Sequence, residues 1–238
     1  MARNMKLVTG KCACCGAKVT MNVAEYTEED DKMLNIMEYF DYKFVSINYC
    51  ENCGYTNSNL TKLVGENTRK IVASEEYQNA VDDGYIDGYE DLPYQEYEDM
   101  AVGEYDAMAM IYKKEGKTNT ITYAKLQNRI AELKSVLRGQ YYENLCDSYD
   151  DDEERTAYQE LVNVLTSQIN EANNECYQAL KSVKLMYPYE VIFVAECLAK
   201  LEKFKKAREL IEGVEANFNI DEELKEYIDE FLTEVEKI

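Results

Sequence analysis

The spacing of apolar side chains predicts two long helices in the middle of the chain. Between Thr120 and Leu145, and again from about residue 155 to Leu180, apolar residues recur at alternating three- and four-residue steps. This spacing is close to a heptad repeat and places the apolar side chains on one stripe of each helix. A short segment that ends with the acidic run 150–154 separates the two stretches, so we expect a long antiparallel helical hairpin.

Shorter helices are predicted on both sides of this hairpin. Tyr and aliphatic residues at helical spacing indicate helices near 67–82 and 94–115, and a last helix from Asp221 to Ile238. Only two Pro and ten Gly occur in 238 residues, and so few helix breakers favour a mainly α fold.

The segment after Pro188 has the apolar spacing of a tetratricopeptide-like (TPR-like) helical pair. Residues 191–198 and 204–214 would pack against each other, with Ala195 and Ala207 at the small positions where such helices cross. A single pair is not a repeat array, so a generic helical hairpin is the alternative interpretation.

The first 70 residues follow a different pattern. Lys18–Val23 and Lys43–Tyr49 have the composition of strands, and Asn59–Val64 is predicted as a third strand. Thr27 is a predicted N-cap for a helix over residues 27–40, which carries acids in its first turn and apolar residues on one face. We therefore expect a small β module with an inserted helix in front of the helical body.

The charge of the chain is unevenly distributed. The 47 acidic and 26 basic residues give a net charge of −21. Acids and bases balance within residues 1–70, whereas residues 71–112 contain twelve acids, seven Tyr and no Lys or Arg. This change predicts a boundary near residue 70 and three domains: 1–70, 71–187 and 188–238. No Gly/Ser- or Pro-rich linker marks the boundary, so we expect the first two parts to pack together.

Two cysteine pairs carry the strongest chemical signal. Cys12 and Cys15 are followed by Gly16, and Cys50 and Cys53 are followed by Gly54. A two-residue spacer lets both thiols of a pair reach one ion, and the Gly permits the positive φ that the tight turn needs. Four thiolates form the closed tetrahedral site of a structural Zn²⁺ ion. The sequence thus predicts Zn²⁺ bound in a zinc ribbon. The same donor set accepts Fe, so a rubredoxin-like iron site is the alternative.

The remaining cysteines are predicted to lie outside this site. Cys14 lies within the first turn, where its side chain should point away from the ion, and we interpret it as a spare exposed thiol. Cys146, Cys176 and Cys197 fall in helical stretches and are expected to be small buried apolar side chains.

Several functional classes find no support in the sequence. The chain has no His, which excludes histidine bases, His-containing metal sites and Ser-His-Asp catalysis. No apolar run approaches the roughly 20 residues of a membrane span, and the N-terminus does not resemble a signal peptide. We therefore expect a non-enzymatic protein of the reducing cytoplasm, with no membrane contact.

The two cysteine turns and the C-terminal segment together resemble a bacterial family of uncharacterised cytoplasmic proteins. The resemblance rests on the turn from Cys12 to Gly16, on the sequence from Tyr49 to Tyr55, and on the helical segment from Ala195 to Leu210. It implies an N-terminal four-cysteine zinc ribbon and a TPR-like helical tail. Ala13 and Glu51 stand where Pro is common in the family, and the family's activity is not assigned.

These observations favour a structural-zinc protein that acts as a protein-protein interaction module or adaptor, with a protein as its partner. One alternative is nucleic-acid binding by the ribbon, where residues 1–24 carry four bases and no acid before Glu25. The charge of −21 disfavours nucleic acid as a partner of the full chain. A further alternative is that the acidic, Tyr-rich stretch 71–112 mimics nucleic acid and inhibits a basic partner.

Overall fold

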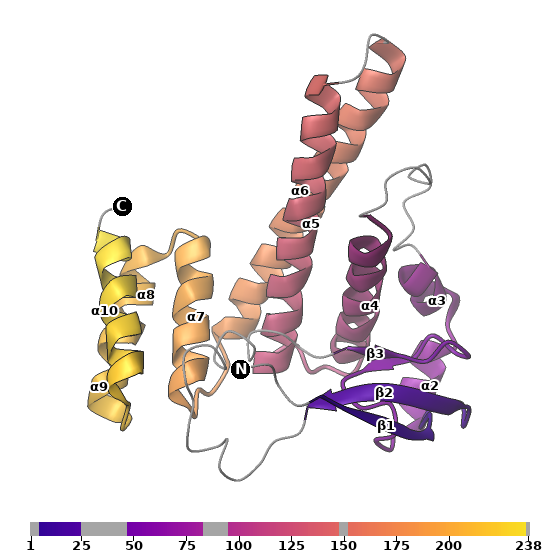
Figure 1. Cartoon of the computed structure of the whole chain (residues 1–238), viewed down its shortest axis with the longest axis horizontal. Helices are drawn as coiled ribbons and strands as arrows, with labels where there is room; N and C mark the ends of the chain where they lie inside the picture. Colours follow the sequence, from indigo (N-terminus) through magenta and orange to yellow (C-terminus); the bar gives the residue numbers. More distant parts are fainter. Residues whose placement is uncertain (1–4, 25–46, 83–94, 148–151, 237–238) are drawn as a thin grey trace.

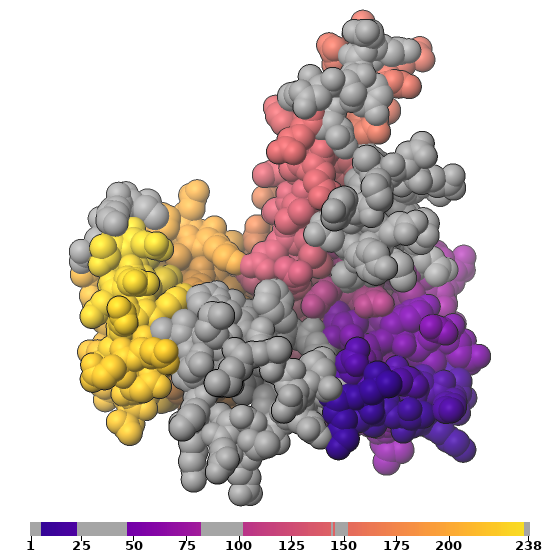
Figure 2. Space-filling view, in the orientation of Figure 1, coloured from indigo at the N-terminus to yellow at the C-terminus, as the bar shows by residue number. Residues whose placement is uncertain are grey.

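The computed structural model is mainly helical and has a small β region at the N-terminal end (Figure 1). It describes residues 5–24, 47–82, 95–147 and 152–236. The β region with the two cysteine turns (residues 5–24 and 47–64, called the ribbon below) and the C-terminal helices (residues 188–236) lie at opposite sides of the face seen in Figure 2. A long helical hairpin projects between them. The mainly α prediction is confirmed.

Two short antiparallel sheets make up the β region. Strand β1 (Met5–Lys11) pairs with β2 (Lys18–Ala24), with Lys11 directly opposite Lys18, and β3 (Asn48–Tyr49) pairs with β4 (Thr56–Asn57). The side chain of Asn48 joins the two sheets, because its amide accepts a hydrogen bond from the backbone N–H of Asn22 and donates one to the carbonyl of Asn22. Each sheet brings together the two ends of one cysteine turn.

The predicted strand at Asn59–Val64 is wrong. The segment turns instead, since the Asn59 side-chain oxygen accepts hydrogen bonds from the backbone N–H and the hydroxyl of Thr61, at 3.0 and 2.8 Å. Such local side-chain bonds offer the backbone an alternative to a strand ladder. Of the predicted strand Lys43–Tyr49, Asn48–Tyr49 is β3, and residues 43–46 lie outside the described residues, as does the predicted helix 27–40.

The helix predicted over 67–82 is two helices, α2 (Glu66–Val72) and α3 (Glu75–Asp82). Ser74 lies at the break. Its hydroxyl donates a hydrogen bond to the carbonyl of Ile71 and accepts one from the N–H of Tyr77, which ends one helix and caps the next.

The other helices match the predicted ranges closely. Helix α4 (Gln95–Lys114) is followed by α5 (Ile121–Asp147) and α6 (Asp152–Leu180), which pack along each other as the long antiparallel pair (Figure 1). Helix α7 (Pro188–Lys200) packs against α8 (Phe204–Glu212), and then come α9 (Val214–Asn217) and α10 (Glu222–Glu236). No helix among the described residues is long and apolar enough to cross a membrane.

Two buried apolar clusters hold these elements. The larger one runs through α4 to α10. The smaller one joins Cys12, Cys50 and Leu60 of the ribbon to Ile71 of α2, Tyr77 of α3 and Ile111 of α4. The ribbon therefore packs against the helices that follow it, as expected from the missing linker. The predicted boundary at residue 70 falls inside α2, and the division into three domains stays a prediction.

Candidate metal centre

The four predicted ligands lie together in the structure. The Sγ atoms of Cys12, Cys15, Cys50 and Cys53 are all within 4.8 Å of one another. Cys12 Sγ is 3.8 Å from Cys53 Sγ, and Cys15 Sγ is 3.8 Å from Cys50 Sγ. Sulfurs at the corners of a tetrahedron around an ion, each about 2.3 Å from it, would be about 3.8 Å apart. The spacing of the sulfurs therefore suits one tetrahedral metal ion.

The two cysteine turns have the same backbone hydrogen bonds. The N–H of Cys12 donates to the carbonyl of Ala17, and the N–H of Gly16 donates to the carbonyl of Cys12. The N–H of Cys50 likewise donates to the carbonyl of Tyr55, and the N–H of Gly54 donates to the carbonyl of Cys50. Gly16 and Gly54 have φ of +80° and +72°, which confirms the reason predicted for a Gly after each pair.

The site is buried on one side and open on the other. Cys12 and Cys50 are 2% and 1% exposed, whereas Cys15 is at the surface. Burial raises the pKa of the Cys50 and Cys53 thiols. Burial acts to raise the pKa of the Cys15 thiol as well, but hydrogen bonds outweigh it and lower that pKa to about 7. They come from the backbone at Ala17 and from the Asn52 amide nitrogen, which is 3.4 Å from the sulfur. Four thiolates held this close need a cation to neutralise them.

Helix α3 holds the second cysteine turn through two side chains. The Tyr77 hydroxyl donates to the carbonyl of Gly54 at 3.0 Å and accepts from the N–H of Thr56 at 3.1 Å. The Gln78 amide donates to the carbonyl of Cys53 at 3.1 Å. Tyr77 is fully buried, so these bonds are shielded from water. The turn that carries two metal ligands is thus fixed to the helical body.

The first cysteine turn is held by two other segments. The N–H of Ala13 donates to the carbonyl of Leu60 at 2.8 Å, and the guanidinium of Arg69 on α2 donates to the carbonyl of Ala13 at 3.2 Å. Gly10, just before this turn, contacts Thr61 so closely that a Cβ at Gly10 would lie 2.5 Å from the Thr61 methyl carbon. Tyr77, Gln78 and Arg69 were not identified as site residues from the sequence, because no local motif links them to the cysteines.

The other cysteines lie outside the four-sulfur group. Cys14 is partly buried rather than fully exposed, and burial raises the pKa of its thiol. Cys176 and Cys197 are both 2% exposed, which confirms the prediction that they are buried. The side chain of Cys146 lies outside the described residues.

The donor set suits a structural ion better than a catalytic one. Four thiolates fill a tetrahedral coordination sphere and leave no position for a substrate or an activated water. Both Zn²⁺ and Fe accept this set, so the geometry does not identify the metal. The chemistry that the arrangement supports is cross-linking of two turns, with 34 residues between Cys15 and Cys50.

Gly54→Ala is expected to lower the free energy of unfolding by about 1–2 kcal/mol, because an L-residue is strained at positive φ. The new Cβ would also lie 3.2 Å from the Gln78 amide. Gly16→Ala has the same φ requirement but nothing within 4 Å, so it isolates the backbone contribution. Gly139→Ala, inside helix α5 with a φ that is not positive and nothing within 4 Å of the new Cβ, is the control and should be neutral or slightly stabilising. Urea unfolding curves measure all three, and equal stability of the three variants would contradict the prediction.

No protein-family model, curated protein or solved structure matches the chain. The resemblance to a bacterial zinc-ribbon family consequently stays a prediction, and the arguments that follow rest on the residues of this chain.

Proposed function

We propose that the chain is a non-catalytic protein-interaction module or adaptor whose ribbon is held by one structural Zn²⁺ ion, with Fe as the alternative metal. The observation that carries this proposal is the closed group of four sulfurs, whose two turns hydrogen-bond to α2 and α3. A metal in such a place fixes the ribbon to the helical body and leaves no open position for chemistry.

The C-terminal helices support an interaction role. Ala195 of α7 and Ala207 of α8 are both fully buried, as is typical where two helices cross closely in a TPR-like pair. A pair of this kind presents its outer surface to other proteins. We take the pair as TPR-like and the protein as cytoplasmic within this proposal.

Nucleic-acid contact by the ribbon is a second candidate, and one observation favours it. The exposed Lys11 and Lys18 lie directly opposite each other on β1 and β2, an arrangement of like charges that is unfavourable without an anion. Among the described residues, neither has a carboxylate partner. The charge of −21 opposes binding of a long polyanion, so we rank this candidate second.

Affinity capture with the metal-loaded full chain from the source cells tests the proposed function. We expect a stoichiometric protein partner that remains bound after nuclease treatment. A partner lost on nuclease treatment, and also lost from a Lys11→Gln/Lys18→Gln chain, would favour the second candidate instead. Recovery of the chain alone in repeated experiments would contradict an adaptor role.

A further inference from the structure

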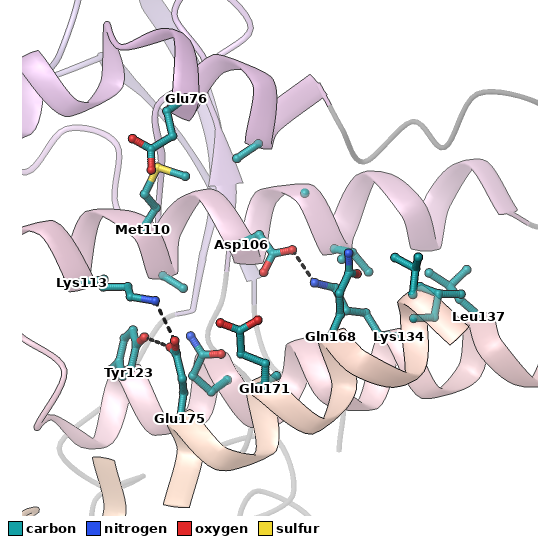
Figure 3. Close-up of a pocket in the computed structure, with 18 of the residues that line it drawn as sticks. Glu76, Asp106, Met110, Lys113, Tyr123, Lys134, Leu137, Gln168, Glu171 and Glu175 are labelled. Carbon is teal, nitrogen blue, oxygen red and sulfur yellow. Dashed lines mark hydrogen bonds and ion pairs between the residues drawn. The ribbon is translucent and has the colours of Figure 1, made fainter. Parts of the chain in front are cut away.

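A cleft of about 710 Å³ lies beside the long helical pair, between α4 and α6 (Figure 3). Helix α5 forms its floor, and α3 contributes Glu76 and Ala80. On α4 the lining extends from Val102 to Lys114, and on α6 from Leu161 to Glu175. The cleft is therefore a groove that follows the helices, not a round cavity.

The floor of the groove is apolar and its rim is partly apolar. Leu137, Leu165 and Ala172 line it and are 2%, 3% and 5% exposed. Val164 on the rim is 51% exposed, an unusually large exposure for an aliphatic side chain beside a buried floor. An apolar stripe between two helices, on top of a third, is the type of surface that an amphipathic helix covers.

The charges in the groove are mostly neutralised by each other. Its three lysines are all paired: Lys113 with Glu175 at 2.7 Å, Lys134 with Asp106 at 2.8 Å, and Lys114 with Glu76. The Tyr123 hydroxyl also donates to Glu175. Glu171, by contrast, is exposed and forms no ion pair within 4 Å among the described residues, and the four acids of the lining outnumber its three lysines. The uncompensated charge of the groove is therefore negative, like that of the chain as a whole.

The size of the groove matches about three turns of helix. Val102 and Lys114 are twelve residues apart on α4, a distance of about 18 Å along the axis. A helix of about three turns has a similar length, so it can lie along the groove with one face buried and the other in water.

We propose that this groove binds an amphipathic helix of a protein partner, with an apolar face toward Leu137 and Leu165 and basic side chains toward Glu171. The proposal rests on the proposed interaction function and names the chemistry of the partner. A second copy of the chain is a poorer occupant because both copies carry a charge of −21. Nucleic acid is a poorer occupant because the unpaired groups in the groove are acidic and apolar.

The test uses the full metal-loaded chain and a synthetic helical peptide of about 14 residues, with Leu on one face and Lys on the others. A peptide of the same composition with the Leu residues scattered around the helix is the control for non-specific charge attraction. Fluorescence anisotropy at physiological salt should give saturable binding of the amphipathic peptide and at least about tenfold weaker binding of the scattered one.

Matched variants locate the binding site. Val164→Arg adds a cation to the rim and should weaken binding by at least about tenfold, whereas Glu171→Lys should weaken it by about threefold to tenfold. Val136→Arg is the control for the first, because Val136 is 46% exposed on α5 but does not line the groove. Glu160→Lys, also exposed on α6 and outside the groove, is the control for the second. Both controls should bind within about twofold of the native chain. If Val164→Arg does not fold, Val164→Ser replaces it.

The outcomes separate this inference from the proposed function. Equal binding of the two peptides, or equal effects of groove variants and controls, would overturn the inference. So would a dimer in sedimentation that dissociates in Val164→Arg, because the groove would then bind a second copy. A cellular partner that the native chain captures and Val164→Arg still captures would overturn the groove but leave the adaptor role in place. No partner with either chain would contradict the adaptor role itself.

Discussion

Replacing Cys53 with Ser is expected to abolish metal binding and to unfold the ribbon together with α2 and α3. Structural Zn²⁺ sites have apparent binding free energies of about 10–16 kcal/mol in small peptides. This is as large as the whole stability of a typical domain, about 5–15 kcal/mol. The sulfur of Cys53 is one of four that lie within 4.8 Å of one another, so its removal leaves an incomplete coordination sphere. Elemental analysis should fall from one metal per chain to near zero, with loss of the near-ultraviolet circular dichroism of the buried Tyr55 and Tyr77.

Cys14→Ser is the matched control, because Cys14 lies in the same turn but outside the four-sulfur group. It should keep one metal per chain and unfold at close to the native temperature. The same elemental analysis distinguishes Zn from Fe in the native chain. A Cys53→Ser chain with a full equivalent of metal would exclude the four-cysteine site.

Tyr77→Phe is expected to lower the free energy of unfolding by about 2–4 kcal/mol, even though no apolar contact is lost. The hydroxyl accepts from the N–H of Thr56 and donates to the carbonyl of Gly54. Removing it leaves both backbone groups buried without these partners, at a cost of about 1–3 kcal/mol each. Burial raises the pKa of Tyr77 to about 12, so the native hydroxyl keeps its proton and can donate at all ordinary pH values. Urea unfolding followed by circular dichroism measures the loss.

Tyr142→Phe provides the comparison, since Tyr142 is 57% exposed on α5 and the same atom is removed. Its effect should stay within about 0.5 kcal/mol. Because Tyr77 holds the turn with Cys50 and Cys53, the Tyr77→Phe chain should also lose metal to a chelator faster than the native chain. A Tyr77→Phe chain as stable as Tyr142→Phe would show that the hydroxyl does not support the site.

The metal ligands could be predicted from the sequence because their geometry is local. A CxxC pair followed by Gly defines a six-residue turn, and each turn closes with its own backbone hydrogen bonds. The repetition of this pattern at Cys12 and Cys50 then indicated that both turns serve one ion. The long helices were predictable for a similar reason, since an apolar stripe of 25 or more residues has few alternative structures.

The errors arose where a polar side chain competes with the backbone ladder. Asn59 and Ser74 each bond to a backbone group two or three residues away, and each interrupts a segment whose composition fits a strand or a helix. Strand β1 was not predicted at all. Its register with β2 is set by the turn at Cys12, which makes Met5–Lys11 a strand through pairing rather than composition.

The residues around the site could not be predicted, because their partners are distant in the sequence. Tyr77 contacts a residue 23 positions away, and Lys113 pairs with Glu175 across 62 positions. In the sequence, Tyr77 was only one of seven Tyr in an acidic stretch. Packing of α3 against the ribbon gives it a specific role, and packing of α4 and α6 on α5 creates a groove that no sequence motif marks.

The long pair of α5 and α6 also affects how the mass of the protein should be measured. Its outer half extends well beyond the other helices (Figure 1), and each helix is about 40 Å long at 1.5 Å per residue. A molecule with such a projection diffuses more slowly than a sphere of the same 27.6 kDa mass. In gel filtration the monomer will therefore elute ahead of compact standards of equal mass. Light scattering, which measures mass independently of shape, is the appropriate method for its oligomeric state.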